Sequence, residues 1–155
     1  MNHSGDAGIV VTGILGREWR YARTPDEIRD LVEAIVSEKP RQFSQVYVWD
    51  RPCRQSKDGT INEFPDHRLR VTTYSQDGWG AVNWMHPGAP DGALADSRNP
   101  DATEDTPPLL SDPEGDLWFP ASASLPLEKV REAVAEYCRT GARPTCVQWQ
   151  PGEWS

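Results

Sequence analysis

The sequence predicts an α+β domain, in which a largely antiparallel sheet of about five to six strands carries two helices on one face. Three observations support this prediction: two amphipathic helical segments, several short runs rich in β-branched and aromatic residues, and a tight-turn dipeptide, Asp77-Gly78, between two of those runs. Strands joined mainly by hairpins, with helices to cover them, favour an antiparallel sheet.

The first helix has the clearest start in the chain. Thr24 can cap it, Pro25 suits its first turn because the missing N–H would have no helical partner there, and Glu27 completes a capping box. Apolar residues then recur at intervals of three and four up to Lys39-Pro40. This stripe predicts a helix that packs on a sheet.

A second amphipathic helix is expected from about Pro126 to Thr140, with Gly141 beyond it as a C-cap. Its apolar face contains Val130, Val134 and a cysteine, Cys138, for which we expect a structural role as a small hydrophobe.

Six segments are expected to form strands, namely 9–15, 17–23, 43–50, 68–75, 79–85 and 145–150. Because Asp77-Gly78 tolerates the positive φ angles of a tight turn, the fourth and fifth segments should form an antiparallel hairpin. In the third, Val46 and Val48 alternate with Tyr47 and Trp49, so the valines should face the helices and the aromatic pair the open face.

The chain is predicted to form one domain, residues 9–155, after a disordered N-terminus at 1–8. Residues 87–120 stand apart as an acidic, proline-rich segment, expected to be loop with one or two short strands. Between Asp91 and Asp116 there are eight acidic residues and one arginine, in a chain whose net charge is −8. The negative charge is therefore concentrated in one segment.

Composition argues against several classes of partner. A chain of net charge −8 would repel nucleic acid and anionic lipid, so we expect no direct contact with nucleic acid or membrane. No run of about 20 apolar residues is present, and the N-terminal residues lack the pattern of a signal peptide, which predicts a cytoplasmic protein. The three cysteines are expected to be reduced thiols.

The sequence shows no recognisable catalytic machinery. The three histidines, His3, His67 and His86, do not stand at ligand spacing from a cysteine or from one another, so neither a metal nor a cofactor is expected. Phosphate-binding loops and serine nucleophile motifs are also absent from the sequence. Two alternatives remain open: a small enzyme that uses carboxylates of the acidic segment as general acid and base, and a structural or assembly subunit.

The favoured interpretation is a binding protein for a basic partner protein. Tryptophans on predicted strands and the acidic segment could together form a recognition surface, because aromatic residues often anchor interfaces and charge steers association. The residues expected to contact the partner are Trp49, Asp77, Trp79, Trp84, Asp101, Glu104, Asp105, Asp112, Glu114 and Asp116.

The C-terminal third of the chain resembles family one of the immunity proteins of bacterial polymorphic toxin systems. The resemblance covers residues 117–151: an aromatic residue before Phe-Pro, a segment ending in Pro-Leu, an amphipathic helix, a Thr-Gly turn and a final Arg-Pro-Thr-Cys-Val-Gln-Trp strand. The matching residues are Trp118, Phe119, Pro120, Pro126, Leu127, Thr140, Gly141, Arg143, Pro144, Val147 and Trp149.

Earlier elements agree with that family in order, whereas the long acidic segment after Pro87 departs from it. The resemblance implies a non-enzymatic antitoxin that binds and neutralises a cognate toxin domain, often a nuclease or a nucleic-acid deaminase, as a monomer in a 1:1 complex. It also implies that Phe119, Val130, Val134 and Val147 are core residues.

Overall fold

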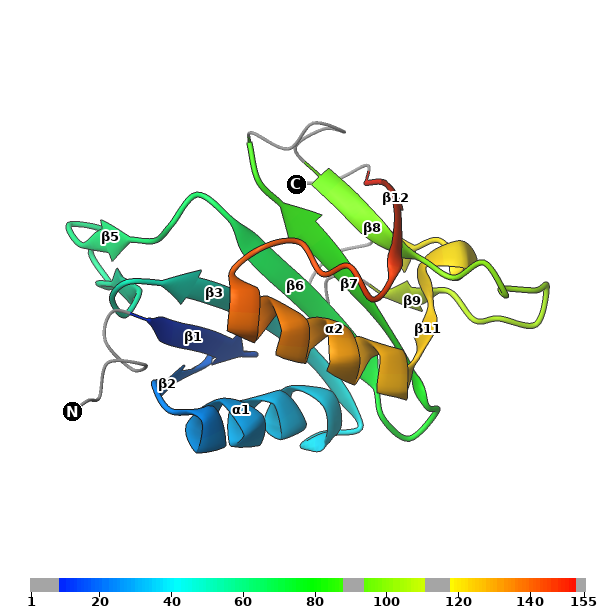
Figure 1. Cartoon of the computed structure of the whole chain (residues 1–155), viewed down its shortest axis with the longest axis horizontal. Coiled ribbons are helices and arrows are strands. Elements are labelled where there is room, and N and C mark those ends of the chain that lie inside the picture. Colours follow the sequence, from blue (N-terminus) through cyan, green and yellow to red (C-terminus); the bar gives the residue numbers. More distant parts are fainter. Residues whose placement is uncertain (1–8, 88–93, 111–117, 153–155) are drawn as a thin grey trace.

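Two helices cover one face of an eight-stranded antiparallel sheet (Figure 1). The computed structural model describes residues 9–87, 94–110 and 118–152. The elements of the main sheet and the helices follow in chain order: β1 (Val10–Leu15), β2 (Glu18–Ala22), α1 (Pro25–Ser37), β3 (Arg41–Trp49), β6 (Arg68–Tyr74), β7 (Trp79–Met85), β8 (Leu94–Arg98), β11 (Leu125–Pro126), α2 (Leu127–Thr140) and β12 (Gln148–Pro151).

The strands are ordered β12-β8-β7-β6-β3-β1-β2, and β11 pairs with the start of β7. Every pairing in this sheet is antiparallel. Two short ribbons lie apart from it: β4 (Arg54–Gln55) with β5 (Asn62–Glu63), and β9 (Leu109–Leu110) with β10 (Trp118–Phe119). The predicted α+β class is therefore confirmed, although the main sheet has more strands than the five to six expected.

The predicted helix boundaries are confirmed. The Glu27 N–H donates to the Thr24 side chain over 3.1 Å, and the Glu27 carboxylate accepts from the Thr24 N–H, which completes the capping box. Helix α2 ends where Gly141 adopts a φ of 70° and its N–H donates to the Tyr137 carbonyl. Both caps satisfy backbone groups that a helix end leaves without partners.

The main core lies between the helices and the sheet. Residues of β1, β3, β6 and β7 that point toward the helices are buried with the apolar stripes of α1 and α2. Its central members include Val11, Val46, Leu69, Val82, Ile35, Val36, Val130 and Val134. In β3 the even-numbered residues are buried and the odd-numbered residues from Phe43 to Trp49 are half-buried, as the alternation of Val46 and Val48 with Tyr47 and Trp49 predicted.

A second, smaller core covers part of the opposite face. Phe119 and Leu109 of the β9–β10 ribbon are buried against Ala81 of β7, with Trp79 packed beside them. The expectation that Phe119 belongs to the core is met, since 1% of its surface is exposed.

Strand β8 is a substantial element inside the segment that was expected to be mostly loop. Asp96, counted from sequence among the clustered acids, is 3% exposed in this strand and accepts a hydrogen bond of 2.8 Å from the Asn83 side chain. The next residue, Ser97, donates to the Ala123 carbonyl. Asp96 is therefore part of the buried structure and not of an acidic surface.

Within the described ranges, neither helix is long and apolar enough to cross a bilayer.

Candidate partner-binding surface

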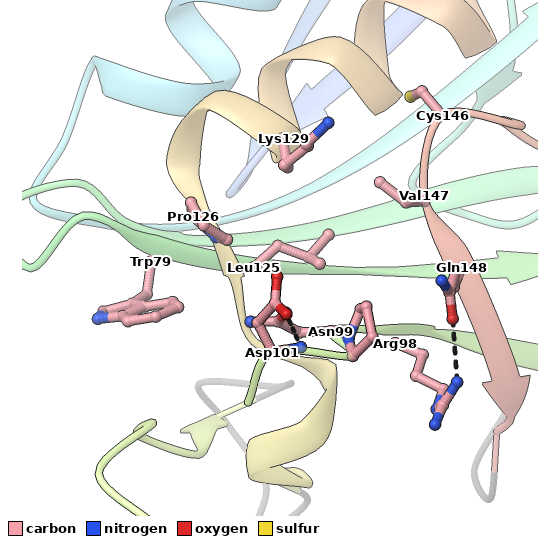
Figure 2. Close-up of a pocket in the computed structure, with 11 residues that line it drawn as sticks. Trp79, Arg98, Asn99, Asp101, Leu125, Pro126, Lys129, Cys146, Val147 and Gln148 are labelled. Carbon is pink, nitrogen blue, oxygen red and sulfur yellow. Dashed lines mark hydrogen bonds between the residues drawn. The ribbon is translucent and has the colours of Figure 1, made fainter. Parts of the chain in front are cut away.

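A pocket of about 370 Å³ opens beside the N-terminus of α2 (Figure 2). Its walls come from the start of β7, the residues after β8, β11, the first turn of α2 and the segment that leads into β12. Residues 99–106, which we call the acidic loop, contain Asp101, Glu104 and Asp105, and the loop lines the pocket through its first three residues, Asn99 to Asp101. Trp79 and Asp101, both expected from sequence to contact a partner, therefore line one hollow.

The acidic loop is held in place by its own polar side chains. Asn99 donates from Nδ2 to the Ser124 carbonyl over 2.9 Å, and its Oδ1 accepts from the Asp101 N–H over 2.9 Å. Further along, the Thr103 hydroxyl accepts from the Asp105 N–H over 3.2 Å. These contacts fix the backbone that carries the carboxylates, which lowers the entropic cost of binding.

Four of the predicted contact residues present carboxylates to solvent at this end of the molecule. Asp101, Glu104 and Asp105 are exposed on the acidic loop, and Asp77 is exposed in the β6–β7 turn, two residues before Trp79. In the part of the chain that the structure describes, none of the four carboxylates forms an ion pair. Their charge is available to a partner.

The β6–β7 turn is itself anchored. Gly78 adopts a φ of 80°, as the predicted tight turn requires, and its carbonyl accepts a hydrogen bond of 3.0 Å from the Leu127 N–H at the start of α2. Asp77 and Trp79 thus lie on a turn that is fixed to the helix bordering the pocket.

Trp84, which was expected from sequence to contact a partner, does not lie on the open face. It is 5% exposed and packs in the main core, with its ring 5.6 Å from that of Tyr137 on α2 in an edge-on arrangement. Trp84 shares a face of β7 with Val82, because side chains two residues apart point to the same side of a strand. A partner cannot reach it in this structure.

Trp49 is half-buried on the open face, as expected, but far from the pocket. It ends the nine-residue strand β3, whose first residue, Arg41, lies opposite Tyr74, which in turn lies opposite Trp79. At about 3.3 Å per residue, Trp49 and Trp79 are separated by more than roughly 20 Å. The predicted set therefore divides into a group around the pocket and a single distant tryptophan.

The open face of the sheet carries arginines among its aromatic residues. The guanidinium of Arg41 lies 4.7 Å from the centre of the Tyr74 ring, and that of Arg51 lies 4.6 Å from the Trp49 ring. Arg68 is 9% exposed in β6, and burial lowers its pKa. An attraction for a basic partner is thus expected at the edge of this face, where the acidic loop lies, and not at its centre.

Two exposed aromatic residues of the described ranges, Tyr21 and Trp118, were not among the predicted contacts. Trp118 on β10 is 55% exposed, although the family resemblance treated it as part of a structural motif. The alternation within the Trp118-Phe119 pair could have indicated this, because one residue of the pair had to face away from the core that Phe119 enters.

Although the histidines do not stand at ligand spacing in the sequence, the fold brings Asp66, His67 and His86 together at one end of β6 and β7. Three predicted contact residues, Asp112, Glu114 and Asp116, lie outside the described residues, as does the N-terminal segment 1–8.

The family comparison covers most of the chain. The model of the family described as immunity protein Imm1 matches residues 16–151, which include every described helix and all strands except β1. Comparison with individually curated proteins gave no match. The match includes the C-terminal third, where the resemblance is most specific, and the earlier elements that agree with the family in order, and the chain belongs to the Imm1 family of immunity proteins.

Proposed function

We propose that this protein binds a cognate toxin domain that acts on nucleic acid, a nuclease or a deaminase, and neutralises it by covering its basic cleft. The proposal places the complex in the cytoplasm with one copy of each protein, and it assigns no enzymatic activity to this chain. Membership of an immunity protein family supports a protein partner.

The observation that carries the proposal is the group of exposed carboxylates on the acidic loop and the β6–β7 turn, of which Asp101 lines the pocket. An enzyme that binds nucleic acid needs lysines and arginines to hold phosphates. The four carboxylates of Asp77, Asp101, Glu104 and Asp105 are exposed on anchored backbone, so they can meet such a cationic cleft with little reorganisation. Their charge would speed the encounter, and the bound protein would then exclude the substrate.

The pocket offers a site where a toxin side chain could be buried, in addition to the charge of the carboxylates. Trp79 is half-buried at its border, with Leu125 and Pro126 nearby, so a side chain of the toxin could be buried there. Buried aromatic contacts surrounded by polar residues usually dominate binding energy. The charged loop would thus favour encounter, and the Trp79 border would slow dissociation.

The proposal also includes predicted contact residues that do not lie at the pocket. Asp112, Glu114 and Asp116 belong to the same acidic stretch of sequence and stay in the proposed contact set. Trp49 would contact a toxin only if the interface extended across the sheet to its opposite end.

Co-expression with the toxin domain encoded beside this chain tests the proposal. The wild-type chain should restore growth and co-purify with the toxin as one complex. A variant with Asp101→Lys, Glu104→Lys and Asp105→Lys should fail to do so, because the three introduced lysines would repel the basic residues of the toxin cleft. Its control reverses three exposed acids elsewhere, with Asp30→Lys, Asp50→Lys and Glu63→Lys. Equal rescue by both variants would contradict the role of the acidic loop.

A further inference from the structure

The end of the β6–β7 hairpin opposite the acidic loop brings together three potential metal ligands. His67 directly precedes β6 and His86 directly follows β7. The first residue of β6, Arg68, lies opposite the last residue of β7, Met85. The two rings consequently stack at a centroid distance of 5.8 Å, with an angle of 17° between their planes. One ligand atom each from Asp66, His67 and His86 lies within 4.8 Å of the others.

We propose that Asp66, His67 and His86 form a binding site for a first-row divalent metal ion, with Zn²⁺ as its best-suited occupant. The site is independent of the proposed toxin-binding surface.

The orientation of His67 is the first argument. Its Nε2 lies 3.0 Å from the Val48 carbonyl oxygen. Because that oxygen can only accept, Nε2 carries a hydrogen, and Nδ1 is the ring nitrogen that faces the Asp66 carboxylate 3.1 Å away. A histidine that donates one N–H to a backbone carbonyl and offers its other nitrogen is oriented as metal-binding histidines usually are.

The distances between the ligand atoms fit a tetrahedral ion. Zn²⁺ binds nitrogen and carboxylate oxygen at about 2.0–2.2 Å, which places neighbouring ligand atoms about 3.3 Å apart. The Asp66 oxygen lies 3.1 Å from Nδ1 of His67 and 3.9 Å from Nε2 of His86, so small side-chain rotations would close the site. Two imidazoles and one carboxylate leave the fourth position for water or another ligand.

The surroundings hold the rings while leaving the site open. His67 lies 6.2 Å from Tyr137 and 6.1 Å from Trp84, and Trp84 also stacks against His86 at 6.1 Å. The side chain of His67 is 19% exposed, that of His86 37% and that of Asp66 68%. The rings are therefore ordered by the core, and the ion can enter from solvent.

Calorimetric titration of the full chain with Zn²⁺ tests this site. We expect one ion per chain with a dissociation constant on the order of micromolar. His86→Ala and Asp66→Ala should each weaken binding at least tenfold, since each removes a ligand. Both side chains are substantially exposed, so the variants should fold. Shifted NMR resonances of His67 and His86, with His3 unaffected, would support the same assignment.

Two control variants separate this site from incidental binding. His3→Gln removes the remaining histidine, and Cys146→Ser removes a half-buried thiol whose pKa is raised to about 11 by burial and by Glu136. Both should bind Zn²⁺ as the wild type does. Absence of saturable binding, or unchanged affinity in both His86→Ala and Asp66→Ala, would overturn the proposal.

Discussion

Trp79 of β7 and Asp101 of the acidic loop line the same pocket (Figure 2). These distant parts of the sequence reach one pocket because Pro126 of β11 lies opposite Trp79, and because Asn99 ties the loop to Ser124 beside β11. An aromatic side chain and unpaired carboxylates are thereby presented together, which makes this end of the molecule the one to test for toxin binding.

Neutralising the acidic loop should slow association with the toxin. In Asp101→Asn, Glu104→Gln, Asp105→Asn, the association rate at low salt should fall about tenfold and depend less on salt, because electrostatic steering is reduced. Stopped-flow measurements over a range of salt concentrations would show this. Asp30→Asn, Asp50→Asn, Glu63→Gln removes the same charge elsewhere and should change the rate much less. Equal rates in the two variants would remove the loop from the interface.

Trp79 and Trp84 should respond differently to alanine substitution. Trp79→Ala should weaken toxin binding by about 2 kcal/mol, since an aromatic residue at an interface pocket is a typical hot spot. Trp84→Ala should instead lower the free energy of unfolding by about 3–5 kcal/mol, because a 5% exposed ring leaves a cavity in the core. Calorimetry of the complex and urea unfolding distinguish the two effects. A binding loss for Trp84→Ala that exceeds its loss of stability would contradict this assignment.

Asn99→Ala should loosen the acidic loop without removing any charge. The variant loses the hydrogen bonds to Ser124 and from Asp101, so amide exchange in residues 101–106 should accelerate and toxin affinity should fall by about 1 kcal/mol. Hydrogen exchange of the free protein measures the first effect. Unchanged exchange would show that the loop does not depend on Asn99 for its conformation.

Glu136→Gln should detach the segment that leads into β12. The Glu136 carboxylate accepts hydrogen bonds from the Thr145 N–H over 2.7 Å, from the Thr145 hydroxyl over 2.9 Å and from the Cys146 N–H over 3.1 Å. An amide can replace this carboxylate only in part, so the free energy of unfolding should fall by about 1 kcal/mol at pH 7.

The same substitution should change how stability depends on pH. Burial alone would raise the pKa of Glu136, but the hydrogen bonds from Thr145 and Cys146 hold it below the usual 4.5. A lowered pKa means that the ionised carboxylate stabilises the fold above pH 4.5, and this contribution disappears as the pH falls through the lowered value. Urea unfolding between pH 7 and pH 3 should therefore show the wild type and Glu136→Gln converging at low pH. A constant difference between them would contradict this assignment.

Local sequence determined much of the fold. The capping box at Thr24, the left-handed glycine at Gly141 and the turn at Gly78 were predictable because each depends on the backbone preferences of a few neighbouring residues. The periodic apolar residues of α1 and α2 likewise define the faces that the helices bury.

Strand β8 was harder to predict because tertiary contacts decide it. Asp96 and Ser97 oppose burial by composition, and partners such as the side chain of Asn83 and the carbonyl of Ala123 make their burial acceptable. A strand whose polar groups find partners far along the chain carries no clear pattern of its own.

The side of the sheet on which Trp84 lies could have been predicted from the sequence. In a strand that contains Val82, a residue two positions later must share its face, so alternation assigns Trp84 to the side of the helices and Trp79 to the other side.

The proximity of His67 and His86 depends on the register of β6 and β7. That register follows from the length of the β6–β7 turn, which the Asp77-Gly78 dipeptide alone does not define.

Hydrogen exchange of the purified complex between this protein and its toxin domain tests the central claim most directly. The account predicts that binding slows exchange in the β6–β7 turn and in the acidic loop, at residues 77–80 and 99–106. Slower exchange confined to α1 and to the end of β3 around Trp49, with these two segments unchanged, would contradict it.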